Sequence, residues 1–195
     1  MKRIIGLYGY SGAGKSTFSG RLRELGAKIC DADEIGRRIL EKGSPLLHKI
    51  KELFGEEVIA EDGSLKRKVL GDIVFNSAEK LALLNSVTRP EIDRIIREEI
   101  NSFSEGIMII DCAMIKELSV CELCDELIFI TAPDEALIKR LLARERISEE
   151  TARGRIARQK ESLDLRGATV IENSKTEEEL LEKADILYER LITEV

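Results

Sequence analysis

The chain has 195 residues, of which 43% are hydrophobic, and this is enough apolar material for one compact α/β domain with a small insertion. Its formal net charge is -6, so we expect no general binding of nucleic acid, because that affinity comes mainly from basic surface. No stretch approaches the roughly 20 apolar residues of a membrane span, and no secretion signal is recognisable, so we expect a cytoplasmic protein without a membrane partner.

Strand-like and helix-like patterns alternate along the chain. Short apolar runs bounded by turn residues predict strands over residues 3–8, 27–31, 107–111, 126–131 and 168–172. Helical spacing and capping residues predict helices over residues 15–25, 133–144, 148–160 and 176–192. Continuous apolar runs at Ile107–Ile110 and Leu127–Ile130 are typical of parallel strands that helices cover on both faces.

The segment between the second and third predicted strands has a different character. Over residues 34–103 apolar side chains recur at helical spacing, and Gly55 and Gly63 break the pattern. We interpret this segment as a helical insertion into a core formed by residues 1–33 and 104–195. The predicted fold is therefore a three-layer α/β/α arrangement with a five-stranded parallel sheet and one helical insertion.

Residues Gly9–Ser16 form a glycine-rich loop that matches G-x-x-x-x-G-K-[ST], the P-loop of nucleoside triphosphatases. A predicted strand precedes the loop and a predicted helix follows it, as the motif requires. The glycines let consecutive backbone N–H groups surround phosphate oxygens, and the helix N-terminus adds a positive dipole. The alternative is a glycine-rich turn before a helix that binds no ligand, but such a turn would not require every residue of the motif. The residues that we expect to contact the nucleotide are Gly12, Ala13, Gly14, Lys15, Ser16 and Thr17.

Two side chains of this P-loop carry the chemistry, and a third candidate residue ends the third predicted strand. Lys15 supplies a positive charge for the β- and γ-phosphates, and the Ser16 hydroxyl is a ligand for Mg²⁺. Asp111 ends the apolar run of the third predicted strand, where an acid often supports the metal ion, either directly or through water. The alternative for Asp111 is a strand-end residue that caps a turn.

The nucleotide-binding fold does not by itself name the reaction. A GTPase switch would need an N-K-x-D motif, and Asn173–Thr176 lacks the acid. A kinase instead needs a base for the acceptor, and Asp33 follows the second strand at the edge where ligands bind in parallel sheets. We predict Asp33 as that base, although it could also cap the helix that we expect over residues 34–41.

Basic residues gather between residues 139 and 160, with eight lysines and arginines against three glutamates. We interpret this helix pair as a lid that closes over the triphosphate, and expect only one or two of its arginines to touch phosphate. A solvated, charged helix face is the alternative. Arg37, Arg67 and Arg89 in the insertion are candidates for contacts with an anionic acceptor, although single arginines usually lie at the surface.

Four cysteines include the C-x-x-C pair Cys121 and Cys124. A zinc site would need two further ligands, and His48 is the only histidine of the chain. We therefore expect free, reduced thiols rather than a metal or redox site.

An ordered series of motifs along nearly the whole chain resembles the dephospho-CoA kinase family. The series comprises the P-loop, Leu25–Ala27, Asp31–Asp33 with Arg37, Phe54–Gly55, Asp62–Arg67, Val74–Phe75, Leu84–Pro90, Arg140, Arg144, Gln159 and Val170–Asn173. Such a series is far more specific than the P-loop alone, which many families share. Arg89 departs from it, because the family usually has histidine there, and so does the segment after Asp111.

The resemblance implies a P-loop kinase fold and the ATP-dependent phosphorylation of the ribose 3′-hydroxyl of dephospho-CoA, with Mg²⁺ as a cofactor. It also implies that Asp33 is the catalytic base, that Arg140 is a lid contact, that Asn173 belongs to the nucleotide site, and that the insertion binds the CoA moiety. Two alternatives are a P-loop kinase of another small metabolite and a nucleotide-binding regulator without turnover. The intact Lys15, Ser16 and Asp33 argue against the regulator.

Overall fold

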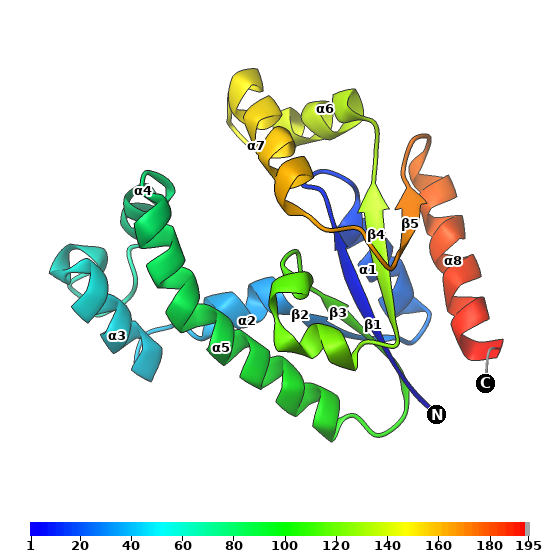
Figure 1. Cartoon of the computed structure of the whole chain (residues 1–195), viewed down its shortest axis with the longest axis horizontal. Helices are drawn as coiled ribbons and strands as arrows, with labels where there is room; N and C mark the ends of the chain where they lie inside the picture. Colours follow the sequence, from blue (N-terminus) through cyan, green and yellow to red (C-terminus); the bar gives the residue numbers. More distant parts are fainter. Residues whose placement is uncertain (194–195) are drawn as a thin grey trace. The chain divides into compact units, whose positions relative to one another are not determined.

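In the computed structural model, which describes residues 1–193, five strands form one sheet in the order β2-β3-β1-β4-β5 (Figure 1). Their bounds are Lys2–Gly9 for β1, Lys28–Asp31 for β2, Gly106–Asp111 for β3, Glu126–Thr131 for β4 and Ala168–Glu172 for β5. β1 pairs in parallel with β3 and β4, and β4 pairs in parallel with β5. The predicted five-stranded parallel sheet is therefore confirmed. Its central strands β1, β3 and β4 are largely buried, which explains their continuous apolar runs.

Helices and short 3₁₀ turns cover this sheet. They are α1 (Lys15–Glu24), η2 (Ile115–Glu117), η3 (Ser119–Leu123), α6 (Asp134–Arg144), α7 (Glu149–Ser162) and α8 (Glu177–Thr193). Figure 1 shows α1 and α8 together on one face of the sheet, and α6 and α7 beyond the carboxyl end of β4. The helices follow their sequence signals: Ser148 caps α7 through the Thr151 N–H, and the Thr176 hydroxyl accepts from Glu179 at the start of α8.

The described residues divide into two compact units. One unit contains Met1–Cys30 and the described residues from Glu99 onward, and the other contains Asp31–Glu98. The second unit is helical, and its elements are α2 (Ala32–Arg38), α3 (Pro45–Phe54), η1 (Glu56–Val58), α4 (Arg67–Phe75) and the first part of α5 (Ala78–Ser102). Its own core contains the fully buried Ile50 and Val58, which fit the helical spacing in the sequence.

Helix α2 differs from the prediction, which placed this helix over residues 34–41. It starts at Ala32 because the Asp31 carboxylate, at the end of β2, accepts hydrogen bonds from the N–H groups of Asp33 and Glu34, at 2.8 and 3.0 Å. Asp31 is thus the cap of the helix. The alternative role of Asp33 as a cap is therefore wrong, and the Asp33 carboxylate is not needed to cap the helix.

A two-pronged ion pair joins α1 to α8. The Arg21 guanidinium donates to the Asp185 carboxylate at 2.6 and 3.0 Å, and this geometry suits both groups. The hydrogen bond from Arg21 lowers the pKa of Asp185 below its ordinary value of 3.8. The pair therefore links the packing of the first and last helices to pH.

Asp185→Asn is expected to lower the Tm at neutral pH by a few degrees, and this difference is expected to disappear in acid. Because the folded pKa of Asp185 is depressed, the pair contributes fully above the ordinary value of 3.8, and its contribution is lost as pH falls through the lower folded pKa. Thermal melts of both proteins across this range test it, with Glu182→Gln on the exposed side of α8 as the control. A difference that persists at the lowest pH would contradict a charge effect.

Among the residues that the structure describes, no helix combines the length and apolar character needed to cross a membrane.

Candidate functional site

The P-loop connects β1 to α1, and its glycines are required by their conformation and by their neighbours. Gly12 and Gly14 have φ values of 82° and 96°, in the left-handed region that favours glycine. A Cβ atom at Gly14 would lie 2.6 Å from Asn173 Nδ2, and one at Gly9 would lie 2.3 Å from the carbonyl oxygen of Ile130. The loop is therefore packed tightly against the carboxyl ends of neighbouring strands, which holds its backbone in the phosphate-binding shape.

Gly14→Ala is expected to destabilise the fold by about 1–3 kcal/mol and to weaken ATP binding, since both the positive φ and the contact with Asn173 oppose a side chain. Gly20→Ala, in the middle of α1 with open space around it, is the matched control and is expected to stabilise the fold by about 0.5–1 kcal/mol. Urea unfolding and calorimetric titration with ATP measure the two effects. Equal stability of the two variants would contradict the packing argument.

Polar side chains from three elements hold the backbone of the P-loop. Asn173, which follows β5 and is only 6% exposed, donates from Nδ2 to the carbonyl oxygen of Ala13 at 2.9 Å. Gln159 on α7 accepts from the Ser11 N–H at 2.9 Å and donates to the Ser11 hydroxyl at 3.1 Å. Arg140 on α6 donates to the carbonyl oxygen of Gly12 at 3.3 Å. The carbonyl oxygens of Gly12 and Ala13 thus bind side chains of the protein.

Lys15 and Asp111 meet in the structure, although 96 positions separate them along the chain. The Lys15 ammonium donates to the Asp111 carboxylate at the end of β3, and Asp111 is only 8% exposed. A carboxylate with so little access to water is stabilised by this cation. The two predicted site residues therefore belong to one cluster beside the P-loop, with Ser16 next to Lys15 at the start of α1.

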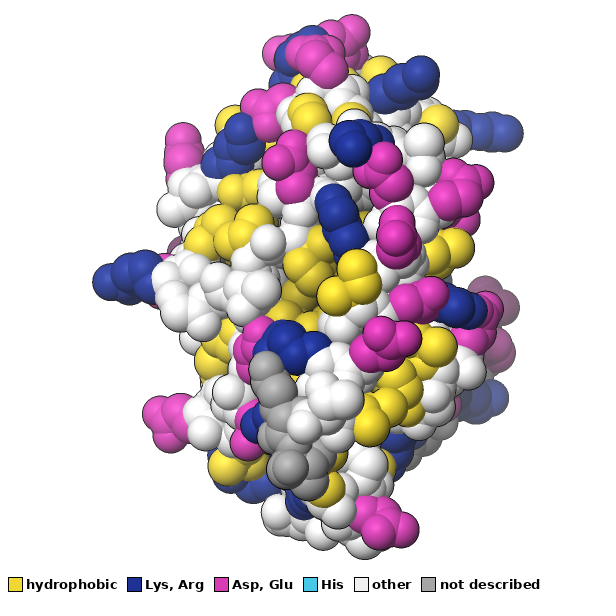
Figure 2. Space-filling view, turned by 90° about the vertical axis from the view of Figure 1, so that its right-hand side faces the viewer, with side chains coloured by type: hydrophobic (Ala, Val, Ile, Leu, Met, Phe, Trp, Pro, Cys, Tyr) yellow, Lys and Arg dark blue, Asp and Glu magenta, His cyan; other side chains and the backbone are white. Residues whose placement is uncertain are grey.

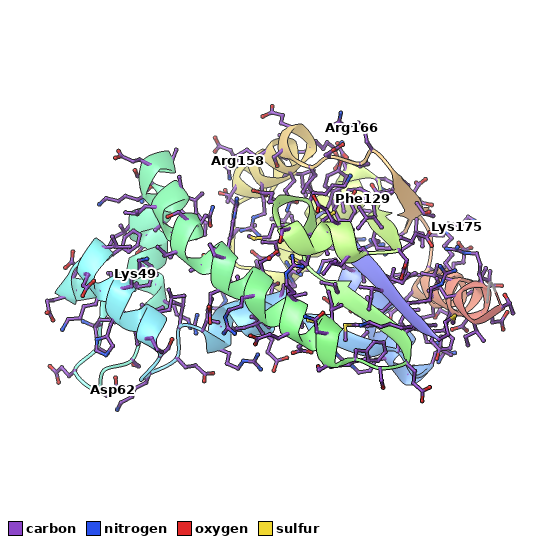
Figure 3. All side chains as sticks on the ribbon, turned by 60° about the horizontal axis from the view of Figure 1, so that its bottom comes forward. Lys49, Asp62, Phe129, Arg158, Arg166 and Lys175 are labelled. Atoms are coloured by element: carbon purple, nitrogen blue, oxygen red, sulfur yellow. The ribbon has the colours of Figure 1, made fainter. Side chains whose placement is uncertain are left out.

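Aromatic rings support the strands below the loop. The Phe129 ring, labelled in Figure 3, packs edge-on against Tyr8 and Tyr10, with centroid distances of 4.9 Å for both pairs. The Tyr8 hydroxyl donates to the carbonyl oxygen of Asp164 at 2.7 Å, and burial raises the pKa of Tyr8 to about 12. Tyr8 is therefore a neutral hydrogen-bond donor that ties the segment after α7 to β1, rather than a proton carrier.

Most of the basic charge on α6 and α7 is already paired. Arg153 contacts Glu135 and Glu149, while Arg155 contacts Glu145 at 2.7 Å and Lys160 contacts Asp134 at 2.6 Å. Figure 3 labels Arg158 on α7, where its side chain is exposed. Arg140 is different, because its guanidinium lies against the Gly12 and Asn173 carbonyl oxygens. Within the predicted lid, Arg140 is thus the arginine that the P-loop contacts.

The remaining predicted residues belong to the helical unit. The Asp33 side chain is exposed at the start of α2. Arg67 donates from its guanidinium to the carbonyl oxygen of Arg37 at 2.9 Å, so two of the three predicted acceptor arginines lie together. Arg89 lies farther along on α5, where it lines a groove together with Asn85.

The family model described as dephospho-CoA kinase matches residues 3–179, which include the P-loop, the helical unit, and both α6 and α7. The chain belongs to the dephospho-CoA kinase family. The predicted family and the P-loop kinase class, a transferase that uses ATP, are thereby confirmed, and a regulator without turnover is not favoured.

Relatives of this dephospho-CoA kinase family chain cover it well. Dephospho-CoA kinase of Carboxydothermus hydrogenoformans is 43% identical over 159 residues, which is 80% of this chain and 77% of that protein. Dephospho-CoA kinase of Corynebacterium diphtheriae is 37% identical over 198 residues, which is 99% of both chains. The solved dephospho-CoA kinase from Campylobacter jejuni is 26% identical, with a TM-score of 0.73 and 98% of both chains covered.

Gln159 and Tyr8 lie at the site of this dephospho-CoA kinase family member, although their residue types do not indicate a role there. Gln159 is the only glutamine of the chain, and only the family resemblance points to it. Its partner Ser11 lies 148 positions away, so no local pattern could have indicated the contact. Tyr8 reads as an ordinary strand residue for the same reason, because its hydrogen bond reaches Asp164.

The cysteines do not contribute to this site. None of the four forms a disulfide bond, and Cys30 and Cys112 are buried. Burial raises the pKa of Cys124 to about 12 and also raises the pKa of Cys121, so both thiols are held in the protonated form. No group of three or more potential metal ligands occurs among the described residues.

Proposed function

We propose that this chain transfers the γ-phosphoryl group of ATP to the ribose 3′-hydroxyl of dephospho-CoA, giving CoA and ADP. The observation that carries the proposal is the family match, which spans both the nucleotide-binding loop and the helical unit. The P-loop with its Lys15–Asp111 pair supports it independently, because these are the groups that a phosphoryl transfer from ATP requires.

The P-loop residues would bind the donor. Backbone N–H groups of Gly12–Ser16 and the α1 N-terminus surround the phosphates, and Lys15 neutralises negative charge on the β- and γ-phosphates. Lys15 would exchange its contact with Asp111 for one with phosphate. Ser16 and Asp111 offer the hard oxygen ligands that Mg²⁺ prefers, so they fit the ion and would hold it. When bound, Mg²⁺ would neutralise charge on the phosphate oxygens.

Asp33 would act as the base. Its exposed carboxylate accepts the proton of the 3′-hydroxyl as that oxygen forms a bond to the γ-phosphorus, while the bond from the γ-phosphorus to the bridging oxygen of ADP breaks. Asp31 provides the helix cap, so the Asp33 carboxylate is not needed for structure. Arg140, which lies against the P-loop, would stabilise the charge of the transferred group.

Arg37, Arg67 and Arg89 would bind the anionic groups of the acceptor, and α6 with α7 would close as the lid over the donor. We further infer that the protein works in the cytoplasm without nucleic acid or a membrane as partner. On the face that Figure 2 shows, acidic and basic side chains are interspersed rather than gathered in one basic stripe, so that face offers no broad basic surface for nucleic acid.

One assay tests the proposal. Purified protein with ATP and Mg²⁺ is expected to release ADP rapidly with dephospho-CoA, and slowly with nucleoside monophosphates or without an acceptor. Release that depends on a nucleoside monophosphate instead would favour a kinase of another metabolite. Nucleotide binding without turnover on any acceptor would contradict a kinase altogether.

A further inference from the structure

The predicted lid joins the sheet through residues 163–167, the connection from the end of α7 to β5. This connection is a closed turn, because the Ala168 N–H donates to the Leu165 carbonyl oxygen at 3.1 Å and the Asp164 carboxylate accepts from the Arg166 N–H at 3.0 Å. Figure 3 labels Arg166 on this connection. Any movement of α7 relative to the sheet has to be absorbed here or between β4 and α6.

Two side chains from the sheet side hold this connection by its backbone. The Tyr8 hydroxyl on β1 donates to the carbonyl oxygen of Asp164 at 2.7 Å, and the Lys116 ammonium in η2 donates to the carbonyl oxygen of Arg166. Lys116 also lies 3.7 Å from the Asp164 carboxylate. Tyr8 is fully buried, and the Lys116 side chain is only 20% exposed. Because little water reaches either donor, a broken bond would leave a polar group without a partner, so the connection is held firmly.

The contact of Lys116 is particular to this chain. Lys116 lies in the segment after Asp111, where the chain departs from the pattern of the dephospho-CoA kinase family. Its partner Arg166 is 50 positions away. The family resemblance therefore does not predict this contact, and the nucleotide-binding role of the P-loop does not explain it.

A movement at the connection would reach the P-loop. Ion pairs tie α7 to α6, among them the pair of Arg153 with Glu135. Near the end of α7, Gln159 holds both the N–H and the hydroxyl of Ser11 in the P-loop. Gln159 precedes Asp164 by less than two helical turns. A fixed connection therefore keeps the helix pair aligned with the P-loop.

We propose that Lys116 and Tyr8 are positioning residues for ATP binding, because they fix the pivot of the lid so that α7 meets the P-loop in one orientation before the nucleotide arrives. Neither side chain needs to contact the nucleotide. This inference rests on the proposed function, in which α6 and α7 are the lid, and it adds residues outside the P-loop to nucleotide recognition. Without a fixed pivot, ATP binding would also have to order the lid, and that ordering opposes binding.

Lys116→Met tests the proposal, because it keeps an unbranched side chain of similar length and removes the donor. It is expected to raise the Kd for ATP about fivefold, the effect of about one lost hydrogen bond, and to leave the KM for dephospho-CoA unchanged. Lys116→Arg, which retains a cationic donor, is expected to bind ATP nearly as tightly as the wild type. Calorimetric titration with ATP measures the affinities.

Lys2→Met is the matched control. The Lys2 ammonium likewise donates to a backbone carbonyl oxygen, that of Ile100, but it lies at the amino end of β1, whereas the P-loop follows the carboxyl end. Lys2→Met is expected to keep the wild-type Kd for ATP. An equal loss of ATP affinity in Lys2→Met and Lys116→Met would overturn the proposal, because any lost lysine contact would then have the same effect.

Hydrogen exchange separates positioning from a general loss of stability. Lys116→Met is expected to speed exchange of the amides over residues 149–167 by about tenfold or more and to leave β1 and β4 at the wild-type rate. Equally faster exchange throughout the sheet would show that Lys116 only stabilises the fold, and it would overturn the proposal. A wild-type Kd for ATP, or wild-type exchange in α7, would do the same. These measurements need no acceptor, so they decide the inference whether or not the wild type phosphorylates dephospho-CoA.

Tyr8→Phe covers the case in which Lys116→Met fails to fold. It removes only the hydroxyl, so the edge-on packing of the ring against Phe129 is retained. It is expected to raise the Kd for ATP and to speed exchange in α7, in the same direction as Lys116→Met. A folded Tyr8→Phe protein with the wild-type Kd and the wild-type exchange would overturn the assignment of the pivot.

Discussion

Asp33→Asn is expected to lower kcat by a factor of about 10²–10⁴, the contribution that a positioned general base usually makes. The amide has nearly the same shape but cannot accept the proton of the acceptor hydroxyl. Because Asp31 caps α2, the substitution is expected to leave the Tm close to that of the wild type. ATP affinity is also expected to stay unchanged, because the P-loop is intact. Steady-state kinetics, thermal melts and ATP titration measure these three quantities.

Glu34→Gln is the matched control for Asp33→Asn. Glu34 is the neighbouring exposed acid in the first turn of α2, so its amide removes the same charge from the same helix end. It is expected to retain nearly full kcat. If both variants lose activity equally, the effect comes from the charge of the helix end. If Asp33→Asn keeps its turnover, Asp33 is not the base.

Lys15→Met is expected to lower kcat/KM for ATP by a factor of about 10²–10³, because the charge that balances the phosphates in the transition state is lost. It is also expected to destabilise the free protein by about 3 kcal/mol, because Asp111, with its 8% exposure, keeps a carboxylate without its cation. Activity assays and urea unfolding measure the two losses separately.

The double variant Lys15→Met with Asp111→Asn separates charge balance from catalysis. Removal of both charges is expected to restore most of the stability that Lys15→Met loses, since no buried charge is then left alone. It is not expected to restore activity, because the phosphates still lack their cation. A double variant that is as unstable as the single one would show that the two residues do not act as a pair in the free protein.

The parts of the fold that could be predicted are those that the sequence marks locally, by apolar residues between turn residues. The runs over 126–131 and 168–172 coincide with β4 and β5, because turn residues bound both of them. The start of α2 could not be predicted as well. Asp31 and Asp33 are both good caps in sequence, and only the geometry at the end of β2 selects Asp31.

In the site, too, contiguous motifs could be predicted from the sequence, whereas contacts between distant residues could not. Gly9–Ser16 is a continuous motif whose residue types follow from phosphate binding, so the sequence alone indicates nucleotide binding. The contacts of Lys15 with Asp111 and of Ser11 with Gln159 span 96 and 148 positions. The sheet order, with β3 beside β1, creates the first contact, and the packing of α7 against the P-loop creates the second. The basic segment was visible in sequence, but its many ion pairs were not, because the partners Glu135 and Glu145 lie across the turn of a helix pair.

The most direct test of the central claim is the identity of the product. After incubation of the purified protein with ATP, Mg²⁺ and dephospho-CoA, phosphorus–proton correlation NMR locates the new phosphate on the acceptor. The proposed function predicts one new phosphomonoester, coupled to the proton on the ribose 3′ carbon, in equal amount to the ADP released. A phosphate at any other position, or ADP release without a phosphorylated acceptor, would contradict it.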